Sequence, residues 1–180
     1  DKTVKLWDLS GGTPVEKGTL TGHSDWVRCV VWSPDGEFVA SASDDKTVKI
    51  WKVATMEEVG TLRGHSGWVT SVAWNHDGSL LASGSYDNTV KLWDPKTMEE
   101  KGTLKGHSGS VYSVAFSPDG SLLASAGGYG DNTVRLWDPK TQEHKGTLTG
   151  HSGPVLSVAY SPDGSLLASA GGYGDNTVRL

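Results

Sequence analysis

The sequence of 180 residues contains one cysteine and no long apolar run. A single cysteine, Cys29, excludes a disulfide framework and favours a reducing compartment, so we expect a cytoplasmic or nuclear protein. No apolar segment approaches the roughly 18 residues that a membrane-spanning helix needs, and Asp1 to Thr3 does not resemble the start of a signal peptide. We therefore expect no association with a membrane.

Clustered positive charge is also absent. The chain has 16 Lys and Arg against 21 Asp and Glu, and no two basic residues are adjacent. Nonspecific affinity for nucleic acid comes from clustered basic side chains that neutralise phosphates, so a nucleic-acid partner is disfavoured. The histidines are too far apart for a zinc-site pattern, and the glycine-rich segment 127–130 opens no helix that could bind phosphate. We expect no metal and no cofactor.

The sequence is, by contrast, rich in repetition. The heptapeptide Gly-Thr-Leu-x-Gly-His-Ser occurs at 18–24, 60–66, 102–108 and 146–152. Each histidine is followed by an apolar segment, an Asp-Gly turn, an Ala-Ser pair and then Thr-Val-(Lys/Arg)-(Leu/Ile). A tryptophan ends every copy except the last. The segment 117–136 recurs unchanged at 161–180. A period of this length indicates structural units that stack to bury a continuous core.

Each repeat has the pattern of four short antiparallel strands. No segment shows a sustained period of 3.6 residues, and Ser-Pro-Asp-Gly, or Asn-His-Asp-Gly in the second copy, is typical of a tight turn. The second strand is expected near 38–43 and its counterparts, the third carries Thr-Val-Lys-Ile-Trp, and a more polar fourth lies near 58–62. The first strands are expected at 26–32, 68–74, 111–116 and 155–160. The pattern therefore predicts an all-β protein of four-stranded meanders.

The repeat resembles the WD-repeat β-propellers, relatives of the G-protein β subunit. The period, the Gly-His pairs and the Trp-Asp pairs at 7–8, 93–94 and 137–138 carry the resemblance, from which Trp51-Lys52 departs. The resemblance covers the whole chain. It implies a β-propeller of four-stranded antiparallel blades around a central channel.

About four blades are expected, forming an incomplete ring or arc. Residues 1–20 would end a preceding blade, 21–62, 63–104 and 105–148 would be blades, and 149–180 would be a truncated blade. Because blades of this family usually close in rings of about seven, within the four to eight of propellers generally, we expect a piece of a longer propeller.

Two interpretations fit the recurring His, Ser and Asp. His23, Ser43 and Asp45 could form a hydrolytic triad, or a structural network in which Trp51 donates to Ser43, Ser43 to His23, and His23 to Asp45. The resemblance supports the network, and so does the repetition of a constellation that an enzyme needs once. The expected network residues are His23, Ser43, Asp45, Trp51, His65, Ser85, Asp87, Trp93, His107, Asp131, Trp137, His151 and Asp175.

The last two copies break this pattern. Gly127 and Gly171 stand where Ser43 and Ser85 stand in the first two, and the turn that follows is two residues longer. The network is then either looser, or Ser125 and Ser169 enter it through a bulge.

Positions that differ among the copies are candidates for function. They gather at the start of the first strand and in the Asp turn, which should share one face beside the channel. Aromatic and arginine side chains are the usual anchors of protein interfaces. The candidates are Trp26, Arg28, Asp44, Trp68, Tyr86, Tyr112, Tyr129 and Tyr173. In the alternative interpretation, Trp26 and Trp68 pack between blades.

The sequence thus predicts a non-catalytic protein–protein interaction scaffold. It would present the Gly-His face to a protein or peptide, as part of a larger regulatory or signalling protein. Two alternatives are a self-assembling repeat protein, in which a second chain completes the ring through open sheet edges, and a propeller hydrolase.

Overall fold

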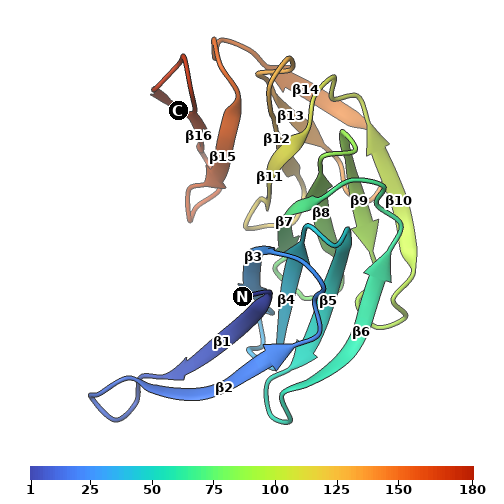
Figure 1. Cartoon of the computed structure of the whole chain (residues 1–180). Coiled ribbons are helices and arrows are strands. Elements are labelled where there is room, and N and C mark those ends of the chain that lie inside the picture. The colour runs from blue at the N-terminus through green and yellow to red at the C-terminus, as the bar shows by residue number, and fades with distance from the viewer.

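The computed structural model describes all 180 residues and consists of seventeen strands without a helix (Figure 1). The strands form five antiparallel sheets, each in chain order. The predicted all-β fold is confirmed. The strands of the five sheets are, in turn, β1 (Thr3–Asp8) and β2 (Val15–Thr21); β3 (Val27–Trp32), β4 (Phe38–Ser43), β5 (Thr47–Lys52) and β6 (Glu57–Arg63); β7 (Val69–Trp74), β8 (Leu81–Ser85), β9 (Thr89–Trp93) and β10 (Glu100–Lys105); β11 (Val111–Phe116), β12 (Leu123–Gly127), β13 (Val134–Trp137) and β14 (His144–Leu148); and β15 (Val155–Tyr160), β16 (Leu167–Gly171) and β17 (Val178–Arg179).

The sheets stand side by side along an open arc (Figure 1). The first strands of the last four sheets, β3, β7, β11 and β15, contact one another in succession on the inner side of the arc. The sheet of β1 and β2 and the sheet of β15 to β17 lie at opposite ends, and no ring is closed. This is the arc of propeller blades that the sequence predicts.

The core lies between sheets rather than within one. Each buried apolar cluster combines the later strands of one sheet with the inner strands of the next, as where Ile50 and Leu62 pack with Val72 and Trp93. Trp93 is only 1% exposed. A buried side chain such as Leu62 contributes about 1.5–3 kcal/mol, so each sheet depends on its neighbour for its stability.

Side-chain hydrogen bonds hold the predicted Ser-Pro-Asp-Gly turns. Ser117 Oγ donates to Asp119 at 2.6 Å and the amide of Ser121 donates to the same carboxylate at 3.0 Å. These two bonds lower the pKa of Asp119 to about 2. Gly120 ends the turn with φ of 70°, a conformation that glycine adopts at little cost.

In each of the three four-stranded sheets, one side chain from the turn before the last strand packs against the preceding sheet. Met98, with φ of 61°, lies over Gly60 of the previous sheet, where an added Cβ would sit 2.5 Å from the methionine sulfur. The glycine of the Gly-Thr-Leu motif therefore forms a socket for the neighbouring sheet. The other two pairs are Met56 over Gly18 and Gln142 over Gly102.

The sockets predict different effects for one substitution at two equivalent positions. Gly60→Ala should cost about 1 kcal/mol of unfolding free energy, because the new methyl group displaces the flexible end of Met98. Gly146→Ala should cost nothing, because no atom lies within 4 Å of its Cβ position. Urea unfolding followed by tryptophan fluorescence measures both, and equal losses would show that the socket has no role in stability.

Candidate functional site

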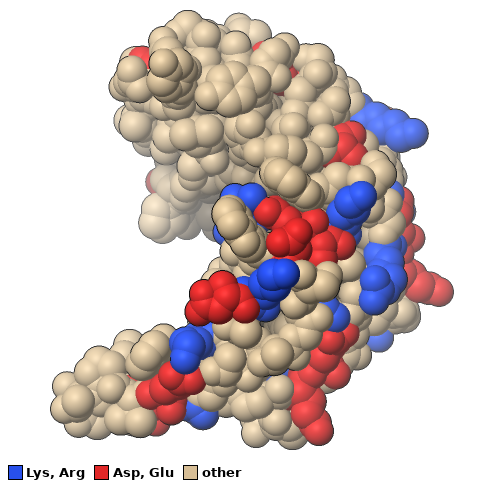
Figure 2. All heavy atoms as spheres, viewed as in Figure 1, with Lys and Arg blue, Asp and Glu red and all other residues tan.

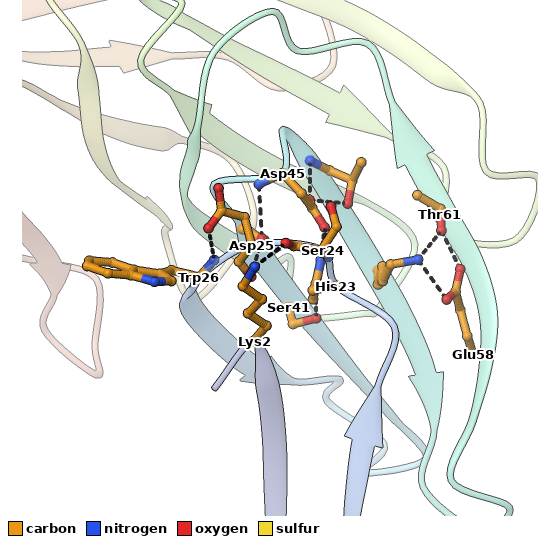
Figure 3. A network of polar contacts seen from close by, with 12 residues as sticks. Lys2, His23, Ser24, Asp25, Trp26, Ser41, Asp45, Glu58 and Thr61 are labelled. Atoms are coloured by element: carbon orange, nitrogen blue, oxygen red, sulfur yellow. Dashed lines mark hydrogen bonds and ion pairs between the residues drawn. The ribbon is translucent and has the colours of Figure 1, made fainter.

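A chain of hydrogen bonds crosses the sheet β3–β6 (Figure 3). The indole of Trp51 donates to Ser41 Oγ at 2.8 Å, Ser41 Oγ lies 2.8 Å from His23 Nε2, and His23 Nδ1 lies 2.7 Å from Asp45 Oδ2. The serine hydroxyl can accept from the indole and still donate its one proton to Nε2. This arrangement fits a neutral His23 whose Nδ1–H donates to Asp45.

The sheet β7–β10 contains the same chain of contacts. Trp93 donates to Ser83 at 2.8 Å, and His65 lies 2.7 Å from both Ser83 and Asp87. Burial opposes the ionisation of Asp87, but hydrogen bonds from His65 and Thr89 outweigh it and hold the pKa of this carboxyl below its usual range. Asp87 is therefore a permanent acceptor at neutral pH.

The structure corrects the predicted serines, since Ser43 and Ser85 do not bridge tryptophan and histidine. Side chains two residues apart on a strand point to the same face, so Ser41 and Ser43 were both geometrically available. Ser41 pairs with Lys49 inside the β4–β5 ladder, whereas Ser43 lies beyond its last pair. Ser43 instead donates to the carbonyl of Asp25 and accepts from the amide of Asp45, both at 3.1 Å. Ser85 likewise accepts from the amide of Asp87 at 3.1 Å.

A signal in the sequence pointed to the right serine. A serine follows the histidine by 18 residues in every copy, at 41, 83, 125 and 169. The residue two positions further on is serine in two copies and glycine in the others. The comparison of all four copies therefore favours the first position.

The third copy uses Ser125 in the ordinary register. Ser125 accepts from Trp137 at 2.8 Å and lies 2.7 Å from His107 Nε2, and the β12–β13 pairing has no register shift. No special bulge is needed, which excludes that route. The contact with Asp131 is looser, because His107 Nδ1 lies 3.1 Å from the carboxylate and is not aligned for a hydrogen bond. His151 in the fourth copy lies at the same 3.1 Å from Asp175, with Ser169 2.9 Å from its other nitrogen.

The longer turn explains why glycine replaces serine in these copies. The carboxylate of Asp131 occupies the place where a Cβ of Gly127 would be, and His107 Nδ1 is 2.8 Å from that place. Burial is the main cause that lowers the pKa of His107, although Asp131 opposes it. The two extra residues thus change the Asp contact and leave the Ser–His contact intact in both copies and the Trp–Ser contact intact in the third.

Five candidate binding residues form a continuous stack that we call the aromatic ladder: Trp26, Arg28, Trp68, Tyr86 and Tyr112. The Arg28 guanidinium lies 5.2 Å from the ring centre of Trp26 and 5.5 Å from that of Trp68. Trp68 and Tyr86 are 5.1 Å apart, and Tyr86 and Tyr112 are 5.6 Å apart. The ladder therefore joins side chains of three successive sheets.

Asp44 fixes the arginine of the ladder. Arg28 Nε donates to Asp44 Oδ1 at 2.7 Å and its Nη2 donates to Oδ2 at 2.5 Å. This two-bond geometry is the strongest that the two side chains can form, and it raises the pKa of Arg28. At the far end, burial and then the Tyr86 hydroxyl raise the pKa of Tyr112 to about 12. The arginine between the two indoles is therefore held in place before any partner binds.

The ladder remains open to solvent. Trp26 is 60% exposed, and Trp68 and Tyr86 are each 42% exposed. Neither tryptophan belongs to a buried core cluster, so neither is buried between two sheets. Tyr129 and Tyr173 are 62% and 84% exposed and stack on no ring of the ladder. The structure therefore brings together six of the eight candidates, Asp44 included.

No group of three or more His, Cys, Asp or Glu side chains is placed to hold a metal ion. The chain has no helix that could cross a membrane.

Comparison with known proteins identifies the repeat. A family profile described as "WD domain, G-beta repeat" matches residues 14–52, 56–94, 98–138 and 142–180. The chain belongs to the WD-repeat family. The matched segments cover most of its length, so the resemblance predicted from the Gly-His and Trp-Asp pairs is confirmed.

Individual relatives match over shorter stretches. Nuclear distribution protein nudF 2 of Aspergillus clavatus is 48% identical over 54 residues, which is 30% of this chain and 12% of the relative. Protein transport protein SEC13 of Phaeosphaeria nodorum is 49% identical over 63 residues, 32% of this chain and 21% of the relative. The matched part is therefore a small share of each relative's length.

The network predicts that two nearby serines in one WD repeat have unequal importance. Ser83→Ala removes the partner of both the Trp93 indole and His65, and should cost about 2–4 kcal/mol, since each orphaned buried group costs about 1–3 kcal/mol. Ser85→Ala should cost about 0.5–1.5 kcal/mol, because it removes one acceptor at a turn. Urea unfolding of the two variants gives the comparison, and a larger loss in Ser85→Ala would contradict the corrected assignment.

Proposed function

We propose that this WD-repeat chain is a non-catalytic scaffold that binds a protein or peptide through the aromatic ladder. The observation that carries the proposal is a row of aromatic rings, most of them exposed, which Arg28 extends across three sheets. Tryptophan, tyrosine and arginine are the residues that most often dominate binding energy at protein interfaces.

The fixed geometry of the ladder supports this role. Asp44 holds Arg28 between two indoles, so little side-chain freedom remains to be lost on binding. The flat faces of Trp68 and Tyr86 suit apolar or proline side chains of an extended peptide, as in grooves lined by aromatic residues. The Arg28 charge is already balanced, so the partner need not supply a carboxylate there.

The buried serines argue against the hydrolase alternative. Ser41 and Ser83 are 0% exposed, and each hydroxyl is engaged by an indole and an imidazole. A nucleophile must reach a substrate, and neither hydroxyl can. We propose that the Trp–Ser–His–Asp network is structural in all copies.

The names of the relatives are consistent with a scaffold. They describe nuclear distribution and protein transport, which are processes and not catalysed reactions. We propose that this chain likewise serves a larger regulatory or signalling protein of the cytoplasm or nucleus, and the single cysteine supports that location.

The ladder is tested with random peptides displayed on phage and selected on the 180-residue chain. Selected peptides should bind Trp68→Ala and Tyr86→Ala about thirtyfold more weakly, which corresponds to a hot-spot loss of about 2 kcal/mol. The control is Trp32→Ala, because Trp32 is 54% exposed but lies at the opposite end of β3 from Trp26. Peptides that bind the ladder variants as tightly as the unmodified chain would refute the proposal.

Self-association is a second candidate function, favoured by complementary contacts at the two ends of the arc. Trp7 is 55% exposed and its indole donates to no serine, while Ser169 bonds to His151 and accepts from no indole. A second copy whose β1 replaces the two-residue β17 beside β16 would bring these groups together. Light scattering should then give at least twice the chain mass, and a monomer at all concentrations would exclude it.

A further inference from the structure

The last two strands of a sheet carry a repeated ion pair. Lys49 of β5 lies 2.7 Å from Glu58 of β6, and Thr61 bonds to both. The pair recurs at the same 2.7 Å as Lys91 with Glu100 and as Lys5 with Glu16. Blue and red side chains accordingly alternate along the outer strands of the earlier sheets, whereas the upper end of the arc shows few charges (Figure 2).

The sheet β11–β14 has lost the acid of this pair. Its basic residue is Arg135, and the position of the glutamate is occupied by His144, as the run Gln-Glu-His-Lys-Gly-Thr-Leu shows beside Met-Glu-Glu-Lys-Gly-Thr-Leu. The threonine is kept, because Arg135 pairs with Thr147 across the two strands. The sheet therefore retains the base and the hydroxyl without their carboxylate.

Arg135 has no replacement partner within the chain. It forms no ion pair, and its Nε is buried without a hydrogen-bond acceptor. The nearby carboxylates are engaged elsewhere, since Asp131 accepts from the amides of Ser108 and Thr133 and Glu143 pairs with Lys145 at 3.0 Å. A guanidinium that is partly buried and unpaired is costly, and its fork of donors matches the oxygens of a carboxylate or phosphate.

His144 and Thr147 lie on β14, the strand that pairs with the strand of Arg135. The ring of His144 stands edge-on to Trp137 at 5.3 Å, and its Nε2 lies 2.9 Å from Thr147 Oγ1. The glutamates that correspond to His144 are partly open to solvent in the two preceding sheets, since the side chains of Glu58 and Glu100 are 33% and 35% exposed. Arg135 Nη1 lies over Gly106, 3.0 Å from the position that a Cβ would take, where Glu100 lies over Gly64 in the preceding sheet. Because Arg135 is only partly buried, an external oxyanion can reach its guanidinium.

We propose that Arg135, His144 and Thr147 form a binding site for an oxyanion, either the phosphate or the carboxylate group of a ligand. The anion pairs with Arg135 as the glutamate pairs with the lysine in the other sheets. The site is separate from the aromatic ladder and does not depend on the function proposed for it.

The test uses the 180-residue chain at neutral pH with three probes, namely inorganic phosphate, a phosphoserine peptide and a glutamate-rich peptide. Binding is measured by calorimetry and by NMR shifts of the His144 ring and Arg135 Nε–H. At least one probe should bind and shift both signals. Response to both phosphate probes identifies phosphate as the ligand group, and response to the glutamate-rich peptide alone identifies a carboxylate.

His144→Glu is the decisive variant, because it restores the pair of the neighbouring sheets. It should bind the probe at least tenfold more weakly and unfold at a higher temperature than the unmodified chain, so a loss of binding cannot be ascribed to misfolding. His76→Glu changes the charge equally on a histidine elsewhere and should leave binding unchanged. The converse variant, Glu100→His, should give the sheet β7–β10 a new anion response at Lys91.

Two results would overturn the proposal. One is the absence of any response to all three probes in the folded chain. The other is binding to His144→Glu within about twofold of the unmodified chain, which would show that the anion sits elsewhere.

Discussion

Every sheet in this protein has two apolar faces, and neither can be buried without a neighbouring sheet. Ile50 and Leu62 are covered by the inner strands of the next sheet, and Leu92 and Leu104 by those of the sheet after that. Because burial of this kind drives folding, stability arises from the contacts between successive sheets. The repetition in the sequence follows from this constraint, since each sheet must offer one face to the preceding sheet and the other face to the following sheet.

The hydrogen-bond network and the glycine sockets serve that constraint in different ways. The network joins the Gly-His turn to the second and third strands of one sheet, so the faces to be buried are held in a fixed relation. The socket at Gly60 admits Met98 of the following sheet, which sets the spacing between sheets. Residues shared by all copies therefore have a structural explanation, which leaves the residues that differ among copies for interaction.

The two surfaces proposed for interaction arise in opposite ways. The aromatic ladder arises from added side chains, because residues that vary from copy to copy come together across three sheets and stay largely exposed. The oxyanion site arises from the absence of a side chain, because one sheet lacks the carboxylate that the preceding sheets have. A repeated fold tolerates both kinds of change, since neither touches the apolar faces between sheets.

The sequence by itself determined the all-β class, the order of the strands, the turns and the family, because these follow from local periodicity, turn residues and a repeat that occurs several times. It also indicated the His and Asp of each network and all five residues of the ladder. The choice of Ser41 over Ser43 was decided only by the tertiary structure, since both side chains face the same way and the β4–β5 register selects one. The stacking of Arg28 and the solitary charge of Arg135 depend likewise on which side chains meet across strands and sheets, and distances along the chain do not specify such meetings.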